Sequence, residues 1–184
     1  MPGVIPVLIA AIVFLPMLVE ARRAAANERA QRARGGIEPA GDVYTMMQVT
    51  YPGAFLAMIA EGVLRGGPST ALLMIGFALF AAAKMLKWWA ILTLGSFWTF
   101  RVIVVPGARL VATGPYAYLP HPNYVAVAGE LLAVALMTGA VIAGPIGAIG
   151  FAVLMWKRIG LEARALRSAQ QHPQEPLGAI LPRN

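Results

Sequence analysis

The sequence contains several uncharged apolar stretches, each nearly as long as a membrane-spanning helix. Residues 1–19, 43–60 and 66–83 contain no Asp, Glu, Lys or Arg. A helix needs about 20 mostly apolar residues to cross the hydrocarbon core of a bilayer. The composition agrees, because 59% of the residues are hydrophobic and only 12% are charged, whereas a soluble domain has about 45–50% and about 25%. The sequence therefore predicts an all-α, polytopic membrane helical bundle.

The composition also excludes several classes of protein and site. A chain so rich in apolar residues is not intrinsically disordered. It contains no Cys and only two His, which excludes disulfides and zinc–thiolate sites and leaves little for any other transition metal. We therefore expect no metal cofactor. In a membrane protein, an excess of basic residues reflects the orientation of the chain in the bilayer. The net charge of +7 therefore does not indicate nucleic-acid binding, and we expect no nucleic-acid partner.

The last apolar block, residues 122–156, is interrupted by a single charge, Glu130. It is either one overlong span or a hairpin of two shorter helices. Gly139 and Gly144-Pro145 supply a break point, and a hairpin returns the basic residues after position 156 to the side that holds most of the others. We therefore expect a C-terminal helical hairpin and about five transmembrane helices in total.

The positions of the basic residues predict the orientation of these helices. With a hairpin, 14 of the 15 Lys and Arg residues fall on one side of the membrane, and Arg65 alone falls on the other. Basic residues collect on the cytoplasmic side, so we expect the N-terminus outside and the C-terminus in the cytoplasm. Residues 1–19 are expected to be a permanent anchor, since arginines follow the apolar run and none precedes it. A cleaved signal peptide is the alternative.

Residues 84–118 form neither a clean span nor a clean loop. Aromatic and basic side chains are interleaved there, namely Trp88, Trp89, Phe97, Trp98 and Phe100 with Lys84, Lys87 and Arg101. This composition is typical of the membrane–water interface, where aromatic rings lie at headgroup depth and basic groups reach water. We therefore expect this segment to lie along the cytoplasmic interface.

The most unusual segment begins at Gly107 and ends where the hairpin starts. Its core reads Gly114-Pro115-Tyr116-Ala117-Tyr118-Leu119-Pro120-His121-Pro122-Asn123-Tyr124, which cannot form a regular helix. Irregular backbone at membrane depth is tolerated where it is buried in protein or lines a cavity. The segment is therefore a candidate site. The alternative is a plain start of the fourth helix, with the tyrosines in an aromatic belt.

Two further features have the residue types needed for chemistry. Arg158 and Glu162 are four residues apart, so they lie on one face of a helix that the hairpin brings back toward His121. Glu130 lies inside a span, seven residues after Asn123 and on nearly the same helical face, and an ionisable group there is a functional candidate. The alternatives are a solvated ion pair for the first feature and, for Glu130, a carboxylate that is protonated or paired with an arginine.

Together these motifs resemble the isoprenylcysteine carboxyl methyltransferase family of membrane methyltransferases. The resemblance covers residues 94–166 and rests on Gly114-Pro115-Tyr116, on His121-Pro122-Asn123-Tyr124, on the hairpin and on Arg158-Ile159 with Glu162. Within the family the chain most resembles short bacterial members associated with O-methylation of alkylpyrones or alkylresorcinols. It departs from the family pattern at Pro120, where an Arg is usual, and at Leu161-Glu162, where two Glu are usual.

From the length we expect one integral membrane domain, residues 1–184, with N-terminal helices in 1–90 and a polar tail in 169–184. The resemblance implies a methyltransferase-like cofactor-binding region in 91–168. It implies S-adenosylmethionine as the cofactor. The methyl acceptor would be an oxygen of a lipophilic molecule, such as a prenylated cysteine, an alkylpyrone or an alkylresorcinol. The implied site faces the cytoplasm from a bacterial membrane and opens laterally to lipid. The oligomeric state stays open.

The roles of individual residues follow from the same resemblance. The implied cofactor-binding residues are Tyr116, His121, Pro122, Tyr124, Arg158 and Glu162. Glu162 would bind the ribose or the amino group of the cofactor and Arg158 its carboxylate, while Trp98 and Arg101 would bind the acceptor head. Glu130 and His121 are the candidate catalytic residues, since a phenolic acceptor needs a base to remove its proton.

Two other classes of function remain open. Membrane sterol reductases carry a similar pattern around His121, Asn123 and Tyr124 and use NADPH, although this chain is short for that class. A non-enzymatic helical bundle is the other alternative. Titration with S-adenosylmethionine and with NADPH discriminates among the three.

Overall fold

The structure is a computed structural model that describes residues 3–108 and 110–171, with side chains described up to residue 167. Over these residues it contains five long α-helices and two short 3-10 helices. They are α1 (Val4–Ala33), α2 (Tyr44–Arg65), α3 (Thr70–Leu94), η1 (Gly95–Phe97), η2 (Gly114–Ala117), α4 (Pro122–Thr138) and α5 (Ala143–Gln171). The predicted all-helical architecture is confirmed, and α4 and α5 form the predicted hairpin. Most of the predicted polar tail, from residue 172 onward, lies outside the described residues.

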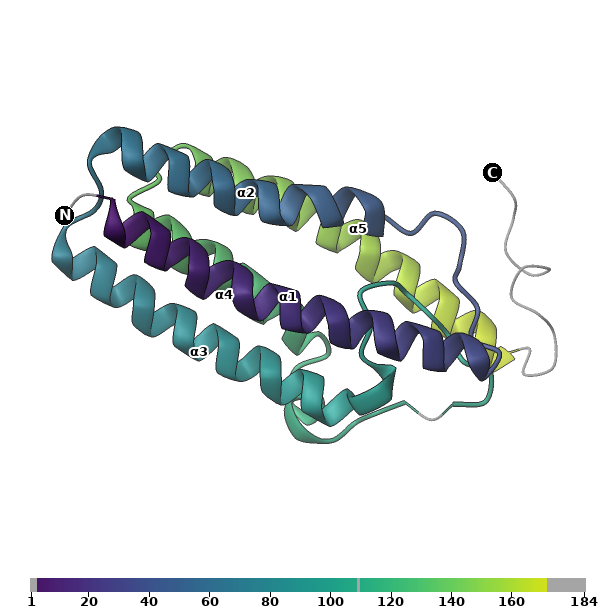
Figure 1. Cartoon of the computed structure of the whole chain (residues 1–184). Helices are drawn as coiled ribbons and strands as arrows, with labels where there is room; N and C mark the ends of the chain where they lie inside the picture. The colour runs from purple at the N-terminus through teal and green to yellow at the C-terminus, as the bar shows by residue number, and fades with distance from the viewer. Residues whose placement is uncertain (1–2, 109, 172–184) are drawn as a thin grey trace.

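The five long helices run roughly along one axis (Figure 1). The start of α1 and the turns between α2 and α3 and between α4 and α5 gather at one end of the bundle. The longer connections after α1 and α3 gather at the other end. α4 packs against all four other long helices. One end of the bundle therefore has short turns, and the other has the irregular segments from which a site can be built.

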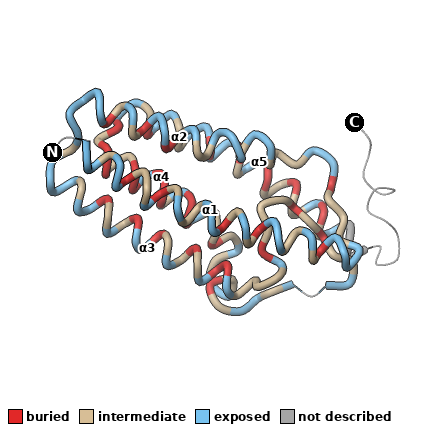
Figure 2. The backbone as a smooth tube through the Cα atoms, in the orientation of Figure 1, coloured by how far each residue is buried: buried red, intermediate tan, exposed pale blue. Residues whose placement is uncertain are grey.

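The core lies around α4, and the outer helix faces are apolar but exposed. Figure 2 shows buried positions concentrated on the inward faces of the helices. On α4 they include Ala126, Val127, Leu131, Val134 and Met137. The outward faces of α1 and α3 instead carry exposed large apolar side chains, among them Val7, Leu15, Met74 and Ile75. Contiguous exposed apolar surface of this kind marks contact with a membrane or with another apolar surface.

Two helical segments of the described chain, Val4–Ala33 and Thr70–Phe97, are long and apolar enough to cross a membrane. Only 17% and 22% of their most apolar windows are buried inside the protein. A helix in the core of a soluble domain would be mostly buried, so these two helices face outward. The arrangement agrees with the membrane helical bundle that the composition predicts.

Two glycines shape the surroundings of α4: Gly76 lets α3 approach it closely, and Gly139 ends it. A Cβ atom added at Gly76 would lie 2.8 Å from the backbone nitrogen of Met137 and 2.9 Å from the carbonyl oxygen of Ala133. These distances are too short for van der Waals contact, so only glycine lets α3 and α4 approach this closely. Gly139 ends α4 with a φ of 69°, in the left-handed region that glycine adopts without steric cost.

α3 is longer than the sequence suggests. The expectation that an interface segment starts at Lys84 is wrong, because the helix continues to Leu94. The ammonium groups of Lys84 and Lys87 do not interrupt it, since both are paired with carboxylates of α1 and α4 inside the bundle. The helix ends only at Gly95, whose φ is 56°. The irregular segment therefore begins at η1.

Candidate functional site

A cavity of about 670 Å³ lies at the end of the bundle that holds the irregular segments. It is lined by residues of all five long helices, of the segment after η1 and of the segment around η2. Sites for cofactors and drug-sized ligands typically measure roughly 300–1,000 Å³. The predicted site residues line this cavity, with the exception of Glu130. The structure therefore brings together the aromatic, His, Arg and Glu side chains of three separate sequence motifs.

The start of α4 presents His121 and Tyr124 to the cavity. His121 is the residue that caps α4, and its backbone angles, φ −136° and ψ 65°, lie outside the helical region. Pro122 occupies the first helical position, where a missing N–H group has no cost. The His121 ring stacks on the Tyr124 ring with the centroids 5.2 Å apart. The proline-rich pattern thus produces an aromatic wall of the cavity.

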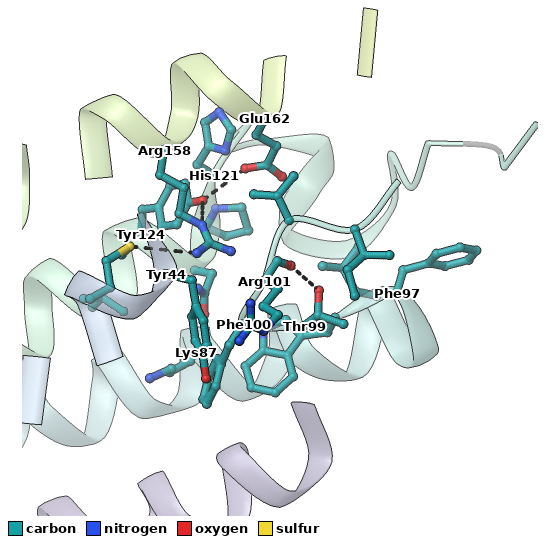
Figure 3. Close-up of a pocket in the computed structure, with 18 of the residues that line it drawn as sticks. Tyr44, Lys87, Phe97, Thr99, Phe100, Arg101, His121, Tyr124, Arg158 and Glu162 are labelled. Atoms are coloured by element: carbon teal, nitrogen blue, oxygen red, sulfur yellow. Dashed lines mark hydrogen bonds between the residues drawn. The ribbon is translucent and has the colours of Figure 1, made fainter. Parts of the chain in front are cut away.

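Tyr124 links the two charged residues that α5 contributes to the cavity wall (Figure 3). The Nε of Arg158 donates a hydrogen bond of 3.0 Å to the Tyr124 hydroxyl, which donates one of 3.0 Å to Oε2 of Glu162. Arg158 is only 7% exposed, so it is not part of a solvated ion pair. Within the described residues its ion-pair partner is Asp42, at 3.6 Å. Arg158 and Glu162 are therefore coupled through Tyr124 rather than directly.

Asp42 supports the site without lining the cavity, and it was not expected from the sequence. Its side chain is 4% exposed, and its carboxylate accepts hydrogen bonds from the backbone N–H groups of Val102, at 2.9 Å, and Tyr44, at 3.1 Å. Together with the pairing to Arg158, these contacts join the loop before α2, the segment after η1 and helix α5. In the sequence an Asp two residues before a helix signals only capping, so its distant partners could not be identified.

The segment after η1 carries Trp98 and Arg101, the two predicted acceptor residues. The polar second half of α1 holds this segment, since the Asn27 amide donates hydrogen bonds to the carbonyl oxygens of Gly95, at 3.0 Å, and Trp98, at 2.7 Å. Trp98 is 2% exposed. The guanidinium carbon of Arg101 lies 4.6 Å from the centre of the Tyr44 ring. Both predicted residues line the cavity, with Trp98 packed firmly into its wall.

Arg101 is already paired with a carboxylate. Its Nη1 lies 2.7 Å from Oε1 of Glu38. Burial raises the pKa of the Glu38 carboxyl, but hydrogen bonds from Arg101 and Arg32 outweigh burial, so this pKa lies below its usual value. The hydrogen bond with Glu38 in turn raises the pKa of the Arg101 guanidinium. Glu38 therefore occupies one N–H group of the Arg101 guanidinium.

Tyr116 and Asn123 supply further polar atoms to the cavity. Burial, and secondarily the charge of Glu162, raises the pKa of Tyr116, so its hydroxyl remains protonated and can donate a hydrogen bond. The Oδ1 of Asn123 is buried and has no hydrogen-bond partner among the described residues. Buried polar atoms normally have a partner. Both atoms are therefore positions at which a ligand can bind.

Glu130 lies next to the cavity and not in its wall. It is 1% exposed, and its carboxylate lies 3.2 Å from Nζ of Lys84 and 3.3 Å from Nζ of Lys87. The Tyr51 hydroxyl donates a hydrogen bond to the same carboxylate. Its partners are thus lysines of α3 and a tyrosine of α2. The sequence had suggested pairing with an arginine as one alternative.

Glu20 of α1 completes this group of buried charges. Its carboxylate lies 2.8 Å from Nζ of both lysines. We call the five side chains Glu20, Tyr51, Lys84, Lys87 and Glu130 the buried charge network. Glu20, Tyr51 and Lys87 line the cavity, while Lys84 and Glu130 do not. None of the three was expected at the site, because each comes from a different helix and no local motif connects them.

Fold and site together define an integral membrane protein with a small-molecule cavity at one end of a helical bundle. Residues 72–168, just over half of the chain, match the isoprenylcysteine carboxyl methyltransferase (ICMT) family. The uncharacterized protein YpbQ of Bacillus subtilis (strain 168) is 34% identical over 161 residues, which cover 87% of this chain and 95% of that protein. No solved structure matches the chain.

The chain therefore belongs to the isoprenylcysteine carboxyl methyltransferase family, and the resemblance seen in its motifs is confirmed. Members are membrane methyltransferases that use S-adenosylmethionine. The family match includes the residues of α4 and α5 at the cavity and the segment after η1. The cavity residues of α1 and α2 lie outside the matched range.

Proposed function

We propose that this chain is an integral membrane O-methyltransferase that moves the methyl group of S-adenosylmethionine to an oxygen of a lipophilic acceptor. The observation that carries the proposal is the shared cavity. The family-matched residues around His121 and Glu162 meet there with apolar residues of α1 and α2, among them Met17 and Met47. A polar cofactor and an apolar acceptor can therefore occupy adjoining parts of one site.

The residues of α4 and α5 fit the chemical groups of S-adenosylmethionine. This molecule carries a carboxylate, an ammonium group, a ribose and an aromatic base. Arg158 supplies a buried cation for the carboxylate. Glu162 and the unpartnered Oδ1 of Asn123 supply acceptors for the ammonium group or the ribose hydroxyls. The stacked rings of His121 and Tyr124 supply an aromatic surface for the base.

When bound, S-adenosylmethionine supplies a methyl group on a sulfonium that is already activated for attack by an oxygen nucleophile. The residues of the chain have to bind both partners, align them and exclude water. Tyr124 fixes Arg158 and Glu162 relative to each other through its two hydrogen bonds. Apolar wall residues such as Val127 and Phe151 remove water from the acceptor oxygen, which increases its reactivity.

We propose a carboxylate, enol or phenol on an apolar tail as the acceptor, as in a prenylated cysteine, an alkylpyrone or an alkylresorcinol. The apolar tail would lie toward α1 and α2, where Met17, Met47 and Pro52 line the cavity. A carboxylate or an acidic enol is already ionised at neutral pH. A phenol has to lose its proton first, and among the residues of the cavity wall His121 is the candidate general base.

We also propose that all five long helices span a bacterial cytoplasmic membrane, with the N-terminus outside and the cavity at the cytoplasmic face. The basic residues support this orientation, because Arg65 is the last residue of α2 and this end of α2 lies at the end of the bundle opposite to the cavity. The chain has no native cysteine. In intact cells a membrane-impermeant thiol reagent should therefore label Ser69→Cys and leave Arg164→Cys unlabelled, and the reverse pattern would contradict this topology.

Transfer of labelled methyl groups tests the proposed activity. Purified protein in lipid is incubated with methyl-labelled S-adenosylmethionine and, separately, with a farnesylated cysteine, an alkylpyrone and an alkylresorcinol. We expect label in the organic phase with at least one acceptor, and calorimetric binding of S-adenosylmethionine without binding of NADPH. Binding of NADPH alone would favour a reductase, and binding of neither cofactor would favour a non-enzymatic bundle.

A further inference from the structure

We propose that Lys87 recognises the methyl acceptor, with its ammonium group binding an oxygen of the acceptor head and favouring the ionised form of an enol or phenol. This inference rests on the proposed function and narrows the acceptor class to oxygen acids on an apolar tail. It places the acceptor head at the buried charge network, whereas the sequence motifs pointed to Trp98 and Arg101.

The first observation is the position of Lys87. Its side chain extends from α3 and is 3% exposed, yet it lines the cavity. Figure 3 shows Lys87 on the side of the cavity away from Glu162 and His121. Glu162 and His121 belong to the proposed cofactor-binding side of the cavity, so Lys87 is placed to contact the methyl acceptor.

The second observation is the set of partners around the Lys87 ammonium group. An ammonium group has three N–H donors. Two carboxylates take part, Glu20 with one oxygen at 2.8 Å and Glu130 with both oxygens, at 3.3 and 3.4 Å. A single N–H group can serve the two long contacts to Glu130, and the Tyr51 ring lies with its centre 5.5 Å from Nζ. Beyond these two carboxylates the described residues provide no oxygen or nitrogen partner, so one donor remains for an oxygen atom of a ligand.

Lys84 offers a comparison within the same network. Its ammonium group pairs with the same two carboxylates, at 2.8 Å from Glu20 and 3.2 Å from Glu130. Lys84 does not line the cavity. The two lysines therefore share their structural role in joining α1, α3 and α4, and only Lys87 can also contact a ligand.

The charges around Lys87 permit binding of an anion. Glu20 faces it from α1, Tyr51 from α2, Lys84 from α3 and Glu130 from α4. The two carboxylates and the two ammonium groups balance, and each carboxylate is held by both lysines. An oxyanion in direct contact with Lys87 is attracted more strongly than the more distant, already paired Glu20 repels it. In this arrangement Lys87, and not His121, promotes ionisation: the hydroxyl proton of the acceptor goes to bulk water as the acceptor binds, and the oxyanion remains at Lys87.

An alkylated nitrophenol is a suitable probe, because its phenolate absorbs visible light and its phenol does not. We expect the apparent pKa of the probe to fall by about one unit or more when it binds the wild-type protein, which is a tenfold change in its ionisation constant. In Lys87→Met the decrease should disappear or reverse, because an apolar cavity next to Glu20 disfavours the phenolate. The affinity for the phenolate should fall roughly 10- to 100-fold.

Lys84→Met is the matched control, since it removes ion pairs with the same two carboxylates. We expect it to lower thermal stability about as much as Lys87→Met while keeping the pKa decrease of the bound probe. Lys87→Arg retains a cation and should keep at least part of the decrease, which provides a second variant if Lys87→Met does not fold. A wild-type protein that does not bind the probe, or binds it without lowering its pKa, overturns the inference. Equal loss in both Met variants overturns it as well.

The readout does not require methyl transfer, so the two proposals can fail separately. A protein that methylates an acceptor but shows no change in probe pKa that depends on Lys87 contradicts the role of Lys87 alone. A protein that lowers the probe pKa through Lys87 but transfers no methyl group contradicts the proposed function alone.

Discussion

Glu130 shows how the surroundings of a charged residue limit its chemical role. Its position inside a predicted span suggested a catalytic base in a polar cavity. In the structure its carboxylate contacts Lys84, Lys87 and Tyr51 and lies outside the cavity wall. A carboxylate held by two ammonium groups and a hydroxyl is poorly placed to remove a proton from an acceptor. Glu130 instead helps to hold the Lys87 side chain in position at the cavity wall.

We therefore predict that Glu130→Gln affects stability more than chemistry. Removing one partner of a buried ion pair leaves an uncompensated charge and costs about 3–5 kcal/mol. The free energy of unfolding should fall by a similar amount, while turnover of the folded fraction falls less than about 10-fold. Denaturant unfolding and initial rates measure the two effects. A stable variant whose turnover falls about 10²- to 10⁴-fold would identify Glu130 as a general base after all.

The single hydroxyl of Tyr124 is a second case in which one residue determines the geometry of a site. It accepts a hydrogen bond from Arg158 and donates one to Glu162. The spacing of Arg158 and Glu162 in the sequence predicts that they share a helical face. It does not predict that they meet through a residue of the preceding helix. The orientation of both charged groups toward the cavity therefore depends on the packing of α4 against α5.

At the scale of helices, the contact of α3 with α4 depends on Gly76. We predict that Gly76→Ala lowers the free energy of unfolding by about 1–3 kcal/mol, because its Cβ atom would collide with the α4 backbone. Gly150→Ala is the control, since a Cβ atom there would meet no atom within 4 Å, and a better helix former should add up to about 1 kcal/mol. Thermal or denaturant unfolding compares the two variants. Equal effects would show that the α3–α4 approach is looser than the structure indicates.

Some helix ends are determined by the local sequence, and others depend on contacts with distant helices. The hairpin break at Gly139 was predictable, because glycine terminates helices through its own backbone freedom. The end of α3 was not, since Lys84 and Lys87 look like the end of an apolar run. Their partners on α1 and α4 become visible only in the folded bundle.

At the scale of the whole molecule, the same distinction applies to the site. The residues of the cavity that were predicted belong to motifs within a short part of the chain, from Trp98 to Glu162. The missed cavity residues Glu20, Tyr51 and Lys87 come from the first three helices, and Asp42, which pairs with Arg158, comes from the loop between the first two. Tyr51 lies 79 residues before its partner Glu130. Hydrophobic patterns place such helices in a membrane but do not determine which side chains meet across the bundle.

The proposed methyl transfer requires that the cavity bind S-adenosylmethionine through the α4 and α5 side chains. Calorimetric titration of the folded wild-type protein, Glu162→Ala and Arg164→Ala with S-adenosylmethionine tests it most directly. We predict binding by the wild type and a roughly 10- to 150-fold weaker affinity for Glu162→Ala, the loss expected for one charge-assisted hydrogen bond. Arg164 is exposed on the same helix, so Arg164→Ala should retain the wild-type affinity. Absence of binding to the folded wild type, or equal affinities of all three proteins, would contradict the claim.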